Sequence, residues 1–144
     1  MRAVVQRSGK STVTVDGKVV GKIDNGLVVL VGFTEGDNLE KIEYIAKKIV
    51  NLRIFDDENG VMNKSILDVG GKILSISQFT LYANCEKGNR PSYIAAMKND
   101  EAIKYYELFN EELRKYIEVE TGVFGADMDC SINNLGPCTI CLER

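Results

Sequence analysis

Ser77-Gln78-Phe79-Thr80 is the first segment whose residue types suit chemistry. It follows the strand-like stretch Ile73–Ser77 without a turn residue and combines hydroxyls, an amide and an aromatic ring. At a strand end, such residues can present backbone N–H groups and short polar side chains to a pocket. Composition alone nevertheless favours a simpler interpretation, a strand with polar residues on its solvent face.

Gly136-Pro137, within the segment Asn134–Thr139, is the second segment whose residue types suit chemistry. A bond before proline is the only kind with an accessible cis form, and glycine keeps the bulk beside that bond minimal. A rigid Gly-Pro pair can direct two adjacent carbonyls at one point in space. The same sequence is equally consistent with a hairpin turn between two expected strands, Met128–Asn133 and Cys138–Leu142.

Histidine is absent, which excludes Ser-His and Cys-His catalytic pairs and His-ligated metal sites built from this chain alone. Cys138 and Cys141 match C-x-x-C, but residues three apart in a strand point to opposite faces and cannot share a metal. Cys85 lies beside Lys87 in a polar loop, where a plain loop cysteine is favoured over a reactive thiol. The sequence therefore predicts no metal site and no cofactor.

Two further patterns fail on spacing. Ser8–Thr12 resembles the end of a phosphate-binding loop, but Val4 stands where the first glycine is needed and a strand-like alternation follows. Asp56–Gly60 resembles a calcium loop, but counting back from Gly60 puts Phe55 at the first ligand position. A polar turn and an acidic surface turn are the favoured interpretations.

The 144 residues are 44% hydrophobic and 27% charged, with a net charge of −3, which indicates one globular domain spanning 1–144. The longest apolar run, Leu27–Val31, is far shorter than the ~20 residues of a membrane span, and no signal peptide is recognised. We expect no membrane association, a cytoplasmic location and free thiols. Because the chain is mildly acidic, any nucleic acid must bind through a small local site.

The elements that position these segments are mostly strands. Asp16-Gly17 predicts a hairpin turn, and the apolar run Leu27–Phe33 predicts a central strand. Helices are expected over Leu39–Ile49, with Asp37 and Glu40 in capping-box spacing, and over about Asp100–Ile117, capped by Asn99 or Asp100. The other expected strands are Val4–Arg7, Thr12–Asp16, Lys18–Ile23, Lys72–Tyr82, Ile117–Glu120, Met128–Asn133 and Cys138–Leu142. This order predicts an α+β fold with two main helices and a largely antiparallel sheet.

Together and in this order, the two candidate segments resemble the D-aminoacyl-tRNA deacylase family, and the resemblance covers essentially the whole chain. The supporting segments are Met1–Arg7, Val13–Gly17, Lys48–Phe55, Leu67–Gly71, Lys87–Ser92 and Thr121–Met128. The resemblance implies a barrel-like core and a homodimer that hydrolyses the ester between a D-amino acid and the 3′-terminal adenosine of tRNA, a form of translational proofreading. It also implies action on glycyl-tRNA.

The resemblance further assigns the site. Ser77, Gln78, Phe79 and Thr80 of one subunit form the pocket, and Gly136-Pro137, cis in this family, enters from the partner subunit with Arg7 holding it in place. Lys87 and Arg90 are expected to meet tRNA phosphates. One departure is Leu135, since family members commonly carry Asp at this position.

An aminoacyl ester is already activated, so orientation and an oxyanion site suffice. Backbone N–H groups near Phe79 and Thr80 are candidate oxyanion donors, and the substrate 2′-OH can help to activate water. Thr80 as a nucleophile is a rival mechanism that lacks an adjacent base. Chirality is read by exclusion, because an L side chain would collide with the Gly136-Pro137 carbonyls.

Two other functions remain open at this stage. A non-catalytic RNA- or nucleotide-binding homologue would keep the pocket without turnover, which the Leu135 change permits. A cysteine-dependent hydrolase would require Cys85 or Cys138.

Overall fold

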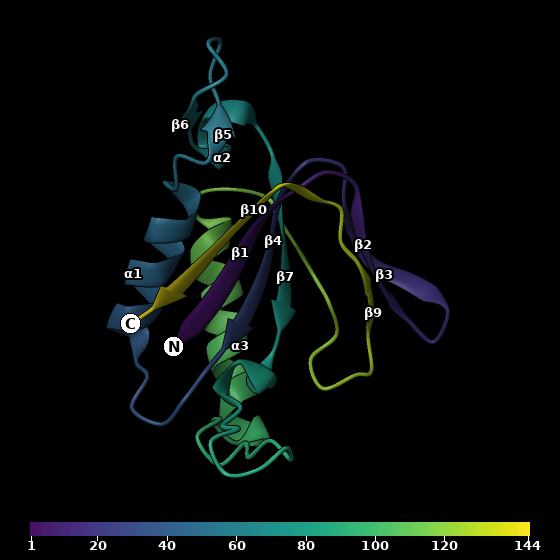
Figure 1. Ribbon diagram of the computed structural model, residues 1–144, viewed down its shortest axis with the longest axis vertical. Helices are drawn as coiled ribbons and strands as arrows, with labels where there is room; N and C mark the ends of the chain where they lie inside the picture. Colours follow the sequence, from purple (N-terminus) through teal and green to yellow (C-terminus); the bar gives the residue numbers. More distant parts are fainter.

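A computed structural model describes all 144 residues and contains two sheets with helices packed on one side (Figure 1). The main sheet has the strand order β10-β1-β4-β7-β8 and the second has the order β3-β2-β9; β5 and β6 form a small hairpin. The strands are β1 (Arg2–Ser8), β2 (Ser11–Val15), β3 (Lys18–Ile23), β4 (Gly26–Gly32), β5 (Phe55–Asp56), β6 (Met62–Lys64), β7 (Lys72–Ser77), β8 (Val119–Thr121), β9 (Asp129–Ser131) and β10 (Asn134–Glu143). The helices are α1 (Leu39–Val50), α2 (Ile66–Val69), the 3₁₀ helix η1 (Phe79–Tyr82) and α3 (Asn99–Arg114).

The α+β class is confirmed, and antiparallel pairs predominate. β1 pairs antiparallel with both β10 and β4, whereas β7 pairs parallel with β4 and with β8. The parallel pairs follow from the long connections through α1 and α3, since a parallel neighbour requires a crossover. The Asp16-Gly17 hairpin is also confirmed, with positive φ at both residues, as a tight two-residue turn between twisted strands requires.

Helix α1 begins where expected but is capped differently. The Asn38 side chain accepts from the Lys41 N–H, so the expected capping role of Asp37 is wrong. Asp37 is buried and binds the Met1 ammonium at 2.5 Å and the Thr34 N–H at 2.9 Å. Helix α3 begins one residue earlier and ends three residues earlier than expected, and Asn99 and Asp100 lie inside it instead of capping it.

Most expected strands lie within about two residues of the observed bounds, but two differ by more. The strand expected to reach Tyr82 ends at Ser77, and the chain then turns into η1. β10 is a single strand that includes Gly136-Pro137, so this pair interrupts an edge strand and is not a hairpin turn. The sequence reasoning did not anticipate α2, β5 or β6, which are all short.

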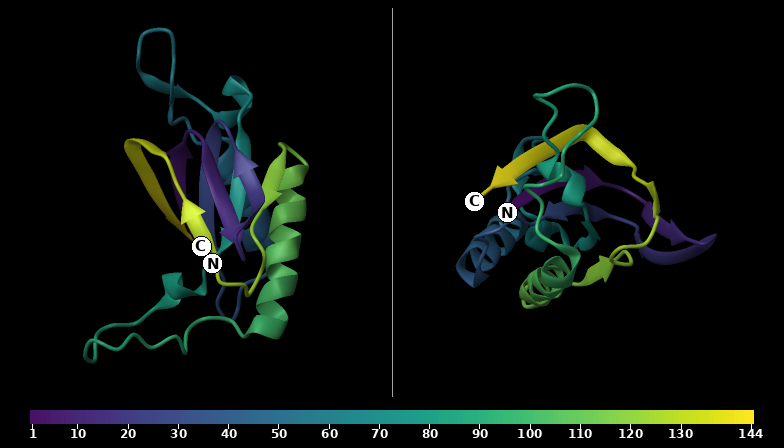
Figure 2. Two further views of the ribbon diagram at one scale, coloured as in Figure 1. Left: turned by 90° about the vertical axis from the view of Figure 1, so that its right-hand side faces the viewer. Right: turned by 90° about the horizontal axis from the view of Figure 1, so that it is seen from below.

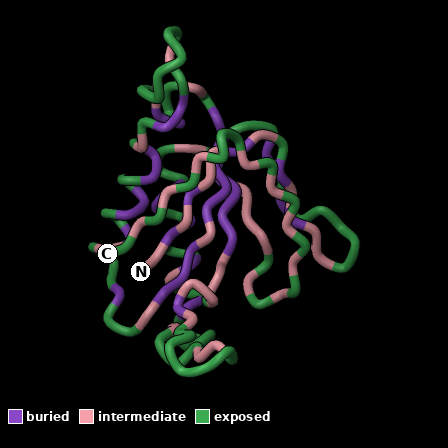
Figure 3. The backbone as a smooth tube through the Cα atoms, in the orientation of Figure 1, coloured by how far each residue is buried: buried purple, intermediate pink, exposed green.

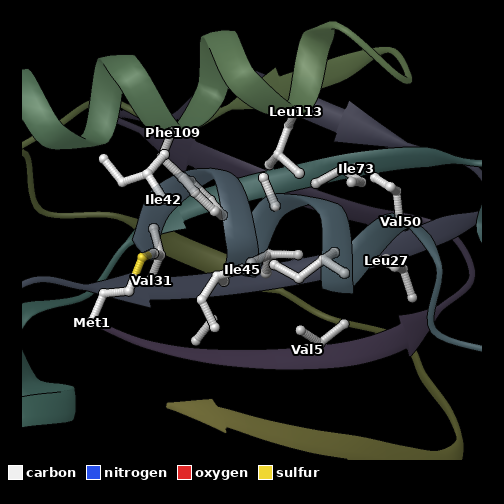
Figure 4. Close-up of a cluster of buried hydrophobic side chains, with 14 of the residues drawn as sticks. Met1, Val5, Leu27, Val31, Ile42, Ile45, Val50, Ile73, Phe109 and Leu113 are labelled. Atoms are coloured by element: carbon white, nitrogen blue, oxygen red, sulfur yellow. The ribbon is translucent and has the colours of Figure 1, made fainter. Parts of the chain in front are cut away.

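The main core lies between the sheet and the two long helices (Figures 3 and 4). Val5, Leu27 and Ile73 of the sheet meet Ile45 of α1 and Phe109 of α3, and all five are fully buried. A smaller core, which includes Val13, Val28 and Leu74, joins the opposite sheet face to the second sheet. No helix has the length and apolar character needed to cross a bilayer.

Candidate functional site

A cavity with a volume of about 320 Å³ lies where β4 and β7 end. Its walls come from the strand ends, the start of α3 and the loop before β9. The lining residues are Val31, Gly32, Phe33, Ile76, Ser77, Gln78, Phe79, Met97, Asn99, Ala102, Phe124, Gly125, Ala126, Asp127, Met128 and Cys130. Three of the four residues expected to form the pocket, Ser77 to Phe79, therefore line one cavity.

The turn from β7 into η1 shapes this wall. Gln78 N–H donates to the Val31 carbonyl at 2.7 Å, which is the last bond of the β4–β7 ladder. A Cβ at Gly32 would lie 2.7 Å from the Gln78 carbonyl oxygen, so only glycine permits this approach. The Phe79 and Thr80 N–H groups open η1, where helical donors have no partner within the helix, and no side chain or loop carbonyl accepts a hydrogen bond from either.

Thr80, unlike the three residues before it, lies outside the cavity wall. Its hydroxyl oxygen accepts from the Gln78 side-chain amide at 2.5 Å, and no carboxylate or amine bonds to it. An amide cannot remove a proton, so Thr80 has no base at hand.

The cavity contains one cysteine, Cys130. Burial, and then the charge of Asp129, raises the pKa of this thiol above its usual value of about 9. The reactive thiolate is therefore disfavoured at neutral pH. Asp127 is the only residue with an ionisable carboxyl group in the cavity wall.

The Gly136-Pro137 bond is cis and lies in a bulge of β10. Residues 135–138 stand opposite the single residue Arg7 of β1, because Asn134 pairs with Ser8 and Thr139 pairs with Gln6. Asn134 closes the bulge. Its amide nitrogen donates to the carbonyls of Arg7 (3.0 Å) and Cys138 (2.9 Å).

The Arg7 side chain, from the neighbouring strand β1, contacts the bulge. Its Nε donates to the Leu135 carbonyl at 3.3 Å, and its Nη1 donates to the Ile54 carbonyl at 2.8 Å and faces Asp56 at 3.3 Å. Gly136 has a φ of +115°, and a Cβ there would lie 2.9 Å from Arg7 Nη2. Arg7 and the Gly-Pro main chain thus form one packed unit, while the Leu135 side chain is exposed.

The two candidate segments occupy opposite ends of the main sheet. Ser8, next to the bulge, pairs with Gly26, which pairs with Lys72 at the start of β7, whereas Ser77 lies five residues later at the far end. That separation is roughly 17 Å along the strands and roughly 14 Å across three strand spacings. Figure 1 shows β1 ending at the end of the sheet where β4 and β7 begin. Within one chain, therefore, the two segments do not line the same cavity.

Lys87 and Arg90 lie in an exposed loop outside the cavity. Paired backbone bonds of 2.8 Å between Asn84 and Ser92 close this loop, which also holds Cys85. All four cysteines are free, and β10 places Cys138 partly buried and Cys141 exposed, so the opposite-face argument is confirmed. No group of three or more acidic or sulfur ligands comes together.

The sequence reasoning missed most of the cavity wall and the structural role of Asn134. The loop Phe124–Met128 supplies five cavity residues, and only the glycines of Gly122 and Gly125 hinted at a special backbone there. Asn134 was part of a recognised motif, but its closing role depends on a partner strand more than a hundred residues away.

Comparisons with known proteins place the chain in one family. The family model described as D-Tyr-tRNA(Tyr) deacylase matches residues 4–143. A D-aminoacyl-tRNA deacylase of Bacillus cytotoxicus is 58% identical over 99% of both chains, and one of Thermus aquaticus is 55% identical over 99% of this chain and 95% of its own.

Two solved structures share the fold. A c-Myc DNA unwinding element binding protein superposes with a TM-score of 0.95 at 42% identity and covers 100% of this chain and 99% of its own. A probable eukaryotic D-amino acid tRNA deacylase superposes with a TM-score of 0.83 over 98% of this chain and 97% of its own, and its 17% identity supports the fold alone. With a family match over almost the full length and relatives above 50% identity, the chain belongs to the D-Tyr-tRNA(Tyr) deacylase family.

Proposed function

We infer that this protein is a D-aminoacyl-tRNA deacylase, which hydrolyses the ester between a D-amino acid and the 3′ end of tRNA. The observation that carries this conclusion is the match of residues 4–143 to the family, with named relatives at 55–58% identity over 99% of the chain. The cavity at the ends of β4 and β7 has the size and polarity of a small-molecule site. It would receive the terminal aminoacyl-adenosine. Because charged tRNA is its substrate, we place the protein in the cytoplasm.

The proposed chemistry uses main-chain donors. The N–H groups of Phe79 and Thr80, at the start of η1, stabilise the oxyanion that forms when water attacks the ester carbonyl. The substrate 2′-OH assists the attacking water, since the chain has no histidine and Thr80 has no neighbouring base. An aminoacyl ester is reactive enough for orientation and these donors to suffice.

The active unit is proposed to be a homodimer with the site between subunits. Support comes from the separation of the two motifs, on the order of 20 Å within one chain, and from the exposed position of Gly136 and Pro137. A symmetric pair allows each bulge to enter the other subunit's cavity.

The Gly136-Pro137 carbonyls would then select the substrate by exclusion. Arg7 and Asn134 hold this main chain rigidly, so an L side chain directed at it would collide, whereas a D side chain would point away. Glycine has no side chain to reject, and glycyl-tRNA is therefore also proposed as a substrate.

Hydrolysis is tested directly with purified protein and D-tyrosyl-tRNA, with L-tyrosyl-tRNA as the control. We expect release of D-tyrosine only. Binding of both tRNAs without release would favour the non-catalytic RNA-binding homologue.

Site sharing is tested by complementation. Gly136→Ala damages the donated bulge. Gly32→Ala damages the receiving cavity, because its Cβ would lie 2.7 Å from the Gln78 carbonyl oxygen, so each variant alone should be nearly inactive. After unfolding and refolding together, half of the dimers are mixed and carry one intact site, which should restore about a quarter of wild-type activity. A mixture as inactive as its components would contradict a shared site.

Substrate assistance is tested with D-tyrosyl-tRNA that ends in 2′-deoxyadenosine. Hydrolysis should slow by about 100-fold, within the range of positioned acid–base groups. An equal rate would remove the 2′-OH from the mechanism.

A further inference from the structure

An exposed aromatic pair stands beside the cavity mouth. Phe79, which lines the cavity, is 52% exposed, and Tyr93 is 40% exposed. Their ring centroids lie 5.1 Å apart with the planes at 71°. Ile94, the next residue, is 94% exposed, so a continuous apolar surface leads outward from the cavity. We call Phe79, Tyr93 and Ile94 the aromatic shelf.

Hydrogen bonds within the chain fix the segment that carries Tyr93 and Ile94. The Thr34 hydroxyl donates to the Ala95 carbonyl at 2.6 Å, and the Met97 N–H donates to the Phe33 carbonyl at 2.9 Å. The Ala96 N–H closes a turn onto the Tyr93 carbonyl at 3.0 Å. A fixed surface loses little entropy when a partner binds.

The segment that carries the shelf is basic although the whole chain is acidic. Between Asn84 and Lys98 the sequence contains Lys87, Arg90 and Lys98 but only one acidic residue, whereas the chain has a net charge of −3. Figure 2 shows this teal-to-green segment extending away from the sheets, where a large ligand can reach it. Exposed rings interspersed with basic side chains are typical of surfaces that bind single-stranded nucleic acid.

We propose that the aromatic shelf stacks the unpaired nucleotide that precedes the terminal adenosine, while Lys87 and Arg90 contact the phosphates that follow outward. The inference rests on the proposed function, which places the terminal adenosine in the cavity. Phe79 belongs to both the cavity and the shelf, and one stacked nucleotide step is only about 3.4 Å, so the neighbouring base reaches the rings. Stacking tolerates any base and positions the strand without reading its sequence.

A pair of synthetic substrates separates the shelf from the catalytic site. D-Tyrosine is esterified either to adenosine alone or to the trinucleotide CCA, and kcat/KM is measured for both. Tyr93 and Ile94 lie outside the cavity lining and would contact only the trinucleotide, so the wild-type protein should prefer that ester. Tyr93→Ala should lower the ratio of the two values by about 5- to 150-fold, the effect of losing one stacked base, and Tyr93→Trp should retain it.

Tyr116→Ala is the matched control, because Tyr116 is 41% exposed but lies beyond the C-terminal end of α3. It should leave the ratio unchanged. The double variant Lys87→Gln/Arg90→Gln should reduce the salt dependence of KM for the trinucleotide by roughly one unit of log–log slope.

The possible failures are distinguishable. Wild-type protein that cleaves neither ester contradicts the proposed function itself. Wild-type protein that cleaves both, with the same ratio in Tyr93→Ala, contradicts only the stacking. Loss of the dimer in Tyr93→Ala, measured by sedimentation, would assign the shelf to a second copy of the chain and overturn the proposal.

Discussion

The two ends of the main sheet each contain a cation paired with an aspartate, but the two pairs differ in exposure. At the cavity end, the Met1 ammonium and Asp37 have fully buried side chains. At the bulge end, Arg7 pairs with Asp56, whose side chain is 55% exposed. Solvent screens the second pair but not the first. The buried pair therefore fixes the start of β1 to the segment before α1, whereas the Arg7–Asp56 pair at the bulge end lies at the surface.

The buried pair should have the largest effect on stability. Asp37→Asn leaves the Met1 ammonium buried without its counter-charge and removes the negative acceptor of the Thr34 N–H. We expect a loss of about 3–5 kcal/mol in the free energy of unfolding, measured with urea. Asp56→Asn at the other end should cost less than about 1 kcal/mol. Equal losses would remove the contrast between the two ends.

Gly136→Ala should have the largest effect on activity. The added methyl group would meet Arg7 Nη2 and the Cys138 nitrogen, and alanine is strained at a φ of +115°. A displacement of the carbonyls should lower kcat/KM for D-tyrosyl-tRNA by about 100-fold. Gly60→Ala is the control, with a φ of +74° but open space around the Cβ. Unchanged rate and chiral preference in Gly136→Ala would argue against exclusion by the main chain.

Thr80→Ala, at the cavity end, should have a smaller effect on activity than Gly136→Ala. The hydroxyl bonds only to the Gln78 amide, and one neutral hydrogen bond contributes about 1 kcal/mol. The variant should therefore keep kcat within about 10-fold of the wild type. Complete loss of turnover in single-turnover assays would restore Thr80 as the nucleophile.

Ionisation of Tyr82 should lower the free energy of unfolding only at alkaline pH. Burial raises the pKa of this phenol from 10.0 to about 12. The folded state thus favours the neutral phenol, and its stabilisation is complete below pH 10 and is lost as the pH rises from 10 to 12. The loss should reach no more than about 3 kcal/mol. Tyr82→Phe should flatten this part of the curve of unfolding free energy against pH, and a parallel curve would assign the sensitivity to other groups.

Local signals predicted local structure well. Asp16-Gly17 carries its own turn geometry, and the apolar face of α1 follows from a repeating pattern, so both were predicted from sequence. The cap of α1 was mispredicted because Asp37 binds an ammonium 36 positions away. The end of β7 was mispredicted because β4 stops pairing there, and no residue in Gln78–Tyr82 signals a turn.

In the candidate site, too, the residues in local motifs were predicted and those placed by tertiary packing were not. Ser77 to Phe79 and Gly136-Pro137 were found as motifs, whereas the loop Phe124–Met128 was not assigned to the site, because it becomes a wall only when it packs beside β7. The distance between the two motifs could not be read from the chain, since it depends on strand register.

The bulge has a second consequence for the edge of the sheet. β10 is an outer strand, and an outer strand with free amides invites pairing with strands from other molecules. Pro137 has no N–H to donate, and the detour of residues 135–138 breaks the regular ladder. The residues that we propose to enter a neighbouring subunit therefore also interrupt this edge and disfavour its pairing with strands of further molecules.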